Sequence, residues 1–312
     1  MRFSSVMMSL AVILNSGTVI AASTITPSTE PFAHLAKGWW HGTVAVTVKK
    51  GDTLLSIGGR YATTPNEIAT FNAIKPTSRL KIGQIINVKY AHLIPSDLPD
   101  GITINLPQRL LFLQKAGVNT GIYALGLGRP SWPTPIGAWT IANKKENKTW
   151  IVPKSIQEEM AREGKVVKTR VAPGANNPLG RYWLGLSLSG YGIHGTIAPA
   201  SINRFQTHGC IRLHPEAIAE LFTQVDTSTT GSNNYWPILL EIQTNGHIVI
   251  EVHPDIYLRH VNGRKALQQL TDAQNVTAKI DWTRADSALK AASGAPVDVT
   301  LLVAAPTPAK PL

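Results

Sequence analysis

The stretch from residue 101 to residue 127 constrains the fold most, because it consists of short apolar runs divided by turn residues. The runs cover residues 101–106, 109–114 and 120–127, and the dividing residues are Pro107-Gln108 and Gly117-Val118-Asn119. Apolar runs of this length with such residues between them are typical of consecutive antiparallel strands. The sequence therefore predicts a mainly β domain that starts at residue 101.

The same pattern of short apolar runs divided by turn residues continues to residue 252. A strand is expected from Arg181 to Leu188, and a hairpin from Pro237 to Val252 turns at Asn245-Gly246. A capping box at Ser155 and Glu158 predicts one short helix, and a second is expected after Pro215. We expect residues 101–252 to form one β-sandwich-like domain.

The flanking segments differ in composition. Residues 1–22 resemble an export signal: Arg2 precedes an apolar run that is too short to span a bilayer stably, and small residues end at Ala22. We expect linkers at 23–43 and 90–100 and a flexible tail at 304–312. A small α-rich C-terminal subdomain is expected at 253–303, with helices at 263–273 and 281–292 and a last strand at 297–303.

The net positive charge of the chain indicates which classes of partner it could bind. The net charge of +11 favours an anionic polymer or surface, although a basic, soluble exported protein is an equally good interpretation. Nucleic acid is disfavoured, because no basic helix or aromatic-rich strand motif accompanies the charge. With an export signal and no later apolar run long enough to span a membrane, we expect a periplasmic protein without a stable membrane span.

Cys210 is the only cysteine, and a lone cysteine in an exported chain cannot form an internal disulfide. A buried, inert thiol is one interpretation. The other is a nucleophile, since His208 and Arg212 flank it and His194 lies sixteen residues earlier (210 − 194) among several glycines. A zinc site built from His194, His208, Cys210 and His214 is a third, but the spacing fits no standard zinc pattern.

Residues 44–89 predict the order strand, helix, helix, strand, with Thr64 capping the second helix before Pro65. With Gly-Asp-Thr-Leu at one end, Asn72 in the middle and Ile-Gly-Gln-x-Ile-x-Val at the other, this segment resembles a LysM module. The resemblance implies binding of peptidoglycan glycan near Gly51, Asp52, Thr53, Leu54 and Ile74. The alternative is that the apolar members of this set belong to the core of the module.

Residues 101–252 resemble the YkuD-type catalytic domain of L,D-transpeptidases. The motifs that carry the resemblance are His194-Gly195-Thr196, Ser201-Ile202 and Thr207-His208-Gly209-Cys210-Ile211-Arg212-Leu213, with Thr134-Pro135-Ile136-Gly137 and Asn177-Pro178-Leu179-Gly180 before them. The resemblance implies a β-sandwich-like fold with the cysteine in a cleft. Asn203 stands where the family commonly has Gly, and Thr207 where it has Ser.

The resemblance also implies roles for individual residues. Cys210 would attack the bond between the third-position diamino acid of a peptidoglycan stem and D-Ala, releasing D-Ala. His194 would be the base, oriented by the backbone carbonyl of Gly195. The N–H groups of Gly209 and Cys210 would hold the oxyanion.

Three neighbouring residues have less defined roles. His208 is expected to support the thiolate or the substrate. Arg212 and Thr207 are expected to contact substrate, and a loop-fixing role for Arg212 is equally compatible with the sequence. The resemblance implies no cofactor and no metal.

Several alternatives for function stay open. The acyl group would pass to a second stem, to a lysine of an outer-membrane lipoprotein or to a free D-amino acid. With water as acceptor the enzyme would be an L,D-carboxypeptidase. A non-enzymatic peptidoglycan-binding protein is the alternative from another class.

Overall fold

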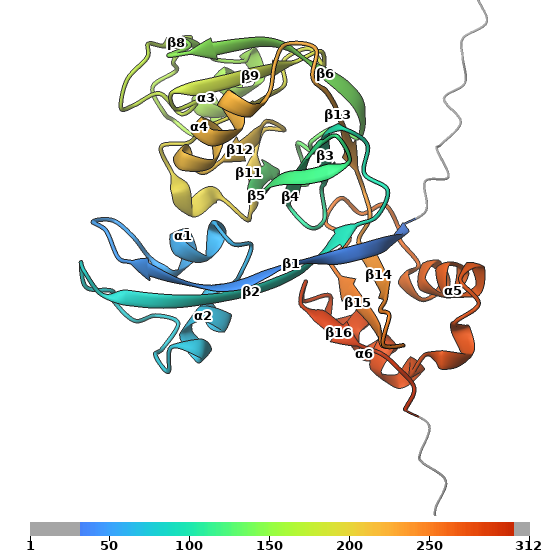
Figure 1. Ribbon diagram of the computed structural model, residues 1–312. Helices are drawn as coiled ribbons and strands as arrows, with labels where there is room; N and C mark the ends of the chain where they lie inside the picture. Colours follow the sequence, from blue (N-terminus) through green and yellow to red (C-terminus); the bar gives the residue numbers. More distant parts are fainter. Residues whose placement is uncertain (1–31, 303–312) are drawn as a thin grey trace, which may run out of the picture. The chain divides into compact units, whose positions relative to one another are not determined.

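The computed structural model describes residues 32–302 (Figure 1). The predicted export signal at 1–22, the first part of the predicted linker at 23–43 and the predicted tail at 304–312 lie outside the described residues. Among the residues that are described, no helix is both long enough and apolar enough to cross a membrane.

The largest element is a nine-stranded sheet with the order β11-β5-β12-β10-β9-β6-β13-β3-β4. Its strands are β3 (Gly101–Asn105), β4 (Leu110–Lys115), β5 (Val118–Gly128), β6 (Gly137–Glu146), β9 (Tyr182–Leu186), β10 (Gly192–His194), β11 (Phe205–Thr207), β12 (Ile211–Leu213) and β13 (Thr230–Asn234). Because β4 also pairs with β5, the sheet returns on itself around its core. The mainly β fold predicted from the sequence is confirmed.

The core inside this sheet is formed by the apolar runs that predicted it. Leu111, Leu125, Leu184 and Ile193 are fully buried, and they pack with Leu221 of α4 (Pro215–Gln224). The helix after Pro215 is therefore confirmed, and its apolar face closes one side of the core.

The predicted strand-helix-helix-strand unit is also confirmed: it consists of β1 (Ala33–Thr47), α1 (Leu54–Gly59), α2 (Pro65–Phe71) and β2 (Ile85–Pro95). The hydroxyls of Thr53 and Thr64 cap α1 and α2 as capping boxes. The two linker predictions are wrong where they meet this unit. β1 already starts at Ala33 and β2 continues to Pro95, because the two strands pair with each other along most of their length.

A second sheet has the order β16-β15-β14-β1-β2. It adds β14 (Ile238–Ile242), β15 (Ile248–Val252) and β16 (Pro296–Asp298), and it is covered by α5 (Gly263–Ala273) and α6 (Trp282–Ala291), with the short 3-10 helix η2 (Thr277–Lys279) between them. The expected helices are confirmed, but the expected last strand is shorter. The boundary at 252 is wrong, because the hairpin β14-β15 packs with the C-terminal helices; strand periodicity does not reveal which sheet a hairpin joins.

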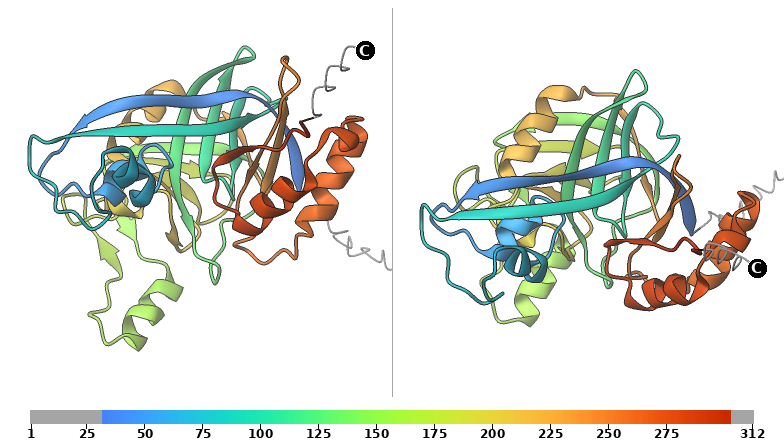
Figure 2. Two further views of the ribbon diagram at one scale, coloured as in Figure 1. Left: turned by 90° about the horizontal axis from the view of Figure 1, so that it is seen from below. Right: turned by 60° about the horizontal axis from the view of Figure 1, so that its bottom comes forward.

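The remaining elements form an excursion between β6 and β9: β7 (Trp150–Ile151), α3 (Lys154–Arg162) and β8 (Arg170–Val171). Figure 2 shows this excursion extending away from the large sheet. The predicted capping box at Ser155 is wrong, since α3 begins at Lys154 after Pro153 and has no side-chain cap. A further 3-10 helix, η1 (Pro199–Ser201), lies between β10 and β11.

One buried carboxylate joins the three parts of the described chain. Glu251 of β15 is 0% exposed, and its Oε2 accepts the backbone N–H of Leu93 at 2.5 Å. Its Oε1 lies 2.7 Å from His253 Nε2, 3.0 Å from Gln108 Nε2 and 3.3 Å from His92 Nδ1. The two sheets and the unit of α1 and α2 are thus tied to a single charged group.

Removing this carboxylate should destabilise the protein strongly. We expect Glu251→Ala to lower the free energy of unfolding by about 3–5 kcal/mol, because several buried donors lose their acceptor. Asp286→Ala is the control: it breaks the exposed pair of Asp286 with Arg264 and should cost at most about 1 kcal/mol. Urea unfolding measures both, and equal losses would contradict the role given to Glu251.

The same group predicts a pH dependence. Burial alone would raise the pKa of Glu251, but hydrogen bonds from His253 and His92 outweigh it and lower this pKa from 4.5 to about 2. A carboxyl group with a depressed folded-state pKa stabilises the fold fully above its unfolded pKa. The Glu251 contribution should therefore be complete above pH 4.5 and be lost as the pH falls towards 2. Urea unfolding of the wild type and Glu251→Ala should converge over that window.

Candidate active site

The pairing of β10 with β12 brings the two predicted catalytic side chains to one face of the large sheet. The strands run parallel, with His194 opposite Arg212. Side chains two residues apart on a strand point to the same face, so Cys210 shares a face with Arg212 and with His194. The backbone of Gly192, which precedes His194 by two residues, lies close enough to the sulfur of Cys210 to lower the pKa of this thiol.

The imidazole of His194 is buried at 3% exposure. Its Nδ1 lies 2.6 Å from the carbonyl oxygen of Gly195, the orienting contact predicted from the sequence, so Nδ1 carries the hydrogen and Nε2 is left as the basic nitrogen. Trp183 stacks on the ring with centroids 5.8 Å apart. Burial and the charge of Arg212 lower the pKa of His194 from 6.5 to about 3, which keeps the ring neutral at physiological pH.

The thiol of Cys210 is partly exposed and points its hydrogen toward the carbonyl of Gly190, 3.8 Å away. Burial raises the pKa of this thiol above its ordinary value of 9.0, while the backbone of Gly192 and the charges of Arg212 and Lys148 oppose the rise. With both pKa values shifted in these directions, the resting pair is a neutral thiol beside a neutral imidazole.

The nucleophile loop is held by its own hydrogen bonds. Thr207 is 1% exposed; its hydroxyl donates to the Cys210 carbonyl at 2.6 Å and accepts from the Gly209 N–H at 3.1 Å. Substrate contact by Thr207 does not fit this burial, and the Gly209 N–H does not point to an oxyanion. The sequence alone does not reveal that the Thr207 hydroxyl forms two hydrogen bonds within the nucleophile loop.

The carbonyl of Gly209 has a partner as well, since the hydroxyl of Thr134 donates to it at 3.0 Å. Gly209 adopts a φ of +97° and the ring of Tyr191 lies against its α-carbon, so a side chain would fit neither the backbone nor the space. The peptide between Gly209 and Cys210 is therefore fixed in orientation, with the Cys210 N–H directed away from Thr134.

His208 turns to a different set of partners. Its Nε2 contacts a carboxylate oxygen of Glu159 on α3, and Arg129 Nη2 lies 3.2 Å from the same nitrogen. Arg129 and Glu159 form an ion pair at 2.7 Å, and Trp132 packs edge-on against the imidazole. Hydrogen bonds from His208 and Arg129 lower the pKa of Glu159 to about 2. His208 thus connects the nucleophile loop to the α3 excursion.

Arg212 is one of the cations of the site. Its Nε is buried and has no hydrogen-bond partner within residues 32–302. The loop-fixing role therefore lacks a hydrogen bond at this atom. Burial lowers the pKa of Arg212, and the neighbouring Cys210 opposes that change.

The site also contains Lys148 and Trp183, which sequence reasoning missed. Lys148 Nζ lies 4.7 Å from the centroid of the Trp183 ring, and the Trp183 ring lies against Gly192. Asn177 donates to the Lys148 carbonyl at 2.9 Å and accepts from the Leu179 N–H at 3.0 Å. The Asn-Pro-Leu-Gly motif could have indicated this part of the site, because its asparagine, Asn177, holds the backbone at Lys148 and Leu179 in place.

The predicted glycan-binding residues divide into two that pack in or against the core of the module and three that form the turn and cap before α1. Leu54 is 3% exposed in the core of its module and Ile74 packs against the same core, so direct contact with glycan does not fit Leu54. Thr53 caps α1, and Asp52 lies 3.6 Å from Arg60. Gly51 occupies the turn with a φ of +88°.

The zinc alternative gains no support. Within the described part of the chain, no three His, Cys, Asp or Glu side chains are arranged to hold a metal ion. His214 instead caps α4, where its Nδ1 accepts the Glu216 N–H at 3.4 Å.

The resting protonation state can be tested on the single thiol. We expect the rate constant for alkylation of Cys210 by iodoacetamide to rise about tenfold per pH unit from pH 6 to pH 8, because the thiolate fraction is still increasing in that range. Intact-mass spectrometry measures the adduct, and Cys210→Ala should form none. A rate constant that does not change with pH would instead indicate a preformed thiolate.

Two family matches cover the regions described above. The L,D-transpeptidase catalytic domain matches residues 99–240, and the LysM domain matches residues 46–89. The "Probable L,D-transpeptidase YbiS" of Escherichia coli is 30% identical over 263 residues, which are 81% of this chain and 85% of that protein. The "Probable L,D-transpeptidase YcfS" of the same species is 28% identical over 232 residues, 70% and 71% of the two chains.

Among solved structures, L,D-transpeptidase 3 from Mycobacterium tuberculosis is 15% identical, with a TM-score of 0.35 over 50% of this chain and 76% of that one. The similarity to YbiS extends over most of both proteins. This chain belongs to the L,D-transpeptidase family and carries a LysM domain.

Proposed function

We propose that this protein is a periplasmic cysteine acyltransferase that acts as a peptidoglycan L,D-transpeptidase. The observation that carries the proposal is the placement of Cys210 and His194 on one face of paired strands, with His194 Nδ1 held by the Gly195 carbonyl. Nε2 of His194 is then the basic nitrogen available to the thiol. This arrangement provides a nucleophile, a base and an orienting acceptor.

In the first half-reaction, His194 takes the thiol proton as the sulfur attacks the carbonyl of the L,D bond. A C–S bond forms, the C–N bond to D-Ala breaks, and His194 returns the proton to the departing amine. The low pKa of His194 and the raised pKa of Cys210 mean that the proton moves during attack and not before it. The product is a thioester on Cys210 and free D-Ala.

The oxyanion of the tetrahedral intermediate needs fixed donors. We assign the Cys210 N–H to this role, because Thr134 holds the preceding carbonyl and so orients the same peptide. The Gly209 N–H, which already donates to Thr207, is not assigned to it.

The second half-reaction passes the acyl group to an amine, and the acceptors are a second stem, giving a 3→3 crosslink, a lipoprotein lysine or a free D-amino acid. Attack by water instead would make an L,D-carboxypeptidase. Mixing the enzyme with tetrapeptide stems and each acceptor, followed by mass spectrometry, separates these outcomes. The LysM module would contribute by tethering the enzyme to glycan near Gly51 and Asp52.

The catalytic assignment predicts loss of activity on two substitutions. Cys210→Ala and His194→Ala should each reduce D-Ala release from a tetrapeptide stem by at least about 10³-fold, since each removes a group that takes part in bond making. His260→Ala, at an exposed histidine, is the matched control and should keep wild-type activity. If Cys210→Ala still releases D-Ala, the protein is not a cysteine transpeptidase.

Arg212 is proposed to hold a substrate carboxylate with its guanidinium group, because the residue as a whole is partly exposed beside Cys210. Arg212→Gln should then raise KM by about tenfold or more and leave kcat within a few-fold of wild type. Steady-state kinetics on a stem and on the same stem with that carboxylate amidated measures the effect. The amidated stem should be insensitive to the substitution, whereas a purely structural role would lower kcat for both substrates.

A further inference from the structure

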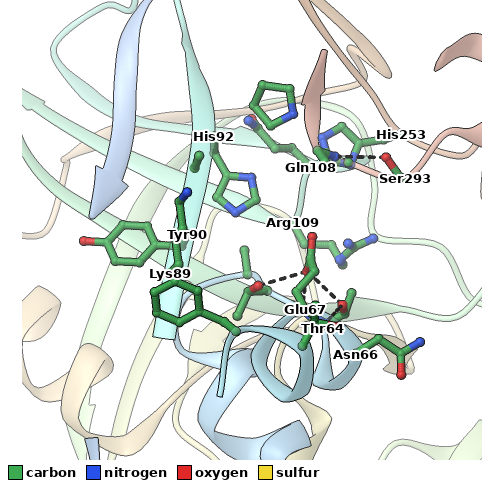
Figure 3. Close-up of a pocket in the computed structure, with 18 residues that line it drawn as sticks. Thr64, Asn66, Glu67, Lys89, Tyr90, His92, Gln108, Arg109, His253 and Ser293 are labelled. Carbon is green, nitrogen blue, oxygen red and sulfur yellow. Dashed lines mark hydrogen bonds between the residues drawn. The ribbon is translucent and has the colours of Figure 1, made fainter. Parts of the chain in front are cut away.

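A cavity of about 600 Å³ lies apart from the catalytic cysteine, where α2, β2, the turn before β4 and the residues before β16 meet (Figure 3). Neither Cys210 nor His194 lines it. None of the five residues predicted to bind glycan lines it either. It is therefore a separate candidate site, formed by segments far apart in the sequence.

Two cations line the cavity without a carboxylate partner. Arg109 donates from Nε to the Asn203 side chain at 2.6 Å and from Nη1 to the Pro107 carbonyl at 3.4 Å, and within residues 32–302 no carboxylate forms an ion pair with it. Burial lowers the pKa of Arg109 to about 10, against the opposing charge of Glu251, so the group stays positive at neutral pH. Lys89 is exposed on β2.

The negative charge lining the cavity is smaller. Glu67 is the acidic residue in the lining, and its Oε2 already accepts hydrogen bonds from Thr63 at 2.9 Å and from Thr64 at 2.7 and 2.8 Å. Figure 3 shows Glu67, Arg109 and Lys89 around the same space. Two cations and one engaged carboxylate favour an anionic ligand.

The apolar part of the lining has one open aromatic face. The side chain of Phe71 is 47% exposed, and no aromatic ring packs against it among the described residues. Tyr90, which also lines the cavity, packs against Trp40 at 4.7 Å and Tyr61 at 5.3 Å. The electron-rich face of Phe71 is therefore available for the C–H groups of a sugar ring.

We propose that this cavity binds a saccharide that carries a free carboxylate, with the carboxylate near Arg109 and Lys89 and the sugar ring on Phe71. The choice of a saccharide rests on the proposed function, which places the protein on cell-wall glycan. Two sources share this chemistry: glycan strands from which the stem peptides have been removed, and other acidic polysaccharides. The site would hold the enzyme on glycan of this kind, independently of the catalytic cleft.

The test is calorimetric titration of the full chain carrying Cys210→Ala, which cannot form a thioester. N-acetylmuramic acid should bind more tightly than N-acetylglucosamine, from which it differs by its carboxylate-bearing group. Glucuronic acid represents the second source and should likewise bind more tightly than glucose. The tighter of the two acids identifies the source, and L-lactate tests for an anion site without sugar recognition.

We expect Lys89→Gln and Phe71→Ala each to raise the Kd for the tighter acid by about tenfold. Lys115→Gln and Ile82→Ala are the matched controls, at residues that do not line the cavity, and should leave the Kd unchanged. Thermal melting checks that each variant is folded.

Three results would overturn the proposal: acids that bind no better than their neutral counterparts, a Kd that Lys89→Gln and Phe71→Ala leave unchanged, or lactate binding as tight as that of the acid sugar. Release of D-Ala by the wild-type enzyme is measured separately. Failure of the catalytic proposal and failure of this one are therefore distinguishable.

Discussion

The chemistry that we propose for this protein depends on one parallel pair of strands, β10 and β12, in a sheet whose pairings are mostly antiparallel. Because β10 runs beside β12 in the same direction, His194 lies opposite Arg212. Cys210 precedes Arg212 by two residues and therefore lies on the same face. A parallel pair needs a crossover, and the segment containing η1 and β11 provides it. The spacing of sixteen residues between the histidine and the cysteine is therefore the length of that crossover. A shift of one residue in the pairing would turn the thiol to the opposite face.

Burial determines the protonation state of the resting site. A histidine at 3% exposure, held by a backbone carbonyl and close to Arg212, favours the uncharged ring, and the thiol beside it also resists charge. Such a pair differs from cysteine sites that rest as an ion pair. In the mechanism that we propose, its reactivity comes from donors and acceptors placed for the intermediate, and a neutral resting thiol reacts slowly with alkylating agents and oxidants.

Local patterns in the sequence predicted what local interactions determine. The cap at Thr64 and the helix after Pro215 depend on neighbouring residues, and the contact of His194 with Gly195 was implied by the family resemblance. What could not be predicted depends on distant partners. Glu159 reaches His208 from the α3 excursion, Lys148 is placed by Asn177, and Glu251 collects donors from separate segments. The hairpin β14-β15 has a clear strand pattern, yet only its pairing with β1 and β16 shows to which sheet it belongs.

The pairing of β1 with β14 also has a consequence for the order of folding. Ala33 lies opposite Ile238, so the first residues of β1 pair with a strand that is synthesised roughly 200 residues later. The remainder of β1 pairs with β2 much earlier in the chain. During synthesis, the hairpin of β1 and β2 can form while its N-terminal extension still exposes an unpaired edge. Completing the second sheet is then a late step, and the chain is most prone to intermolecular strand pairing before it.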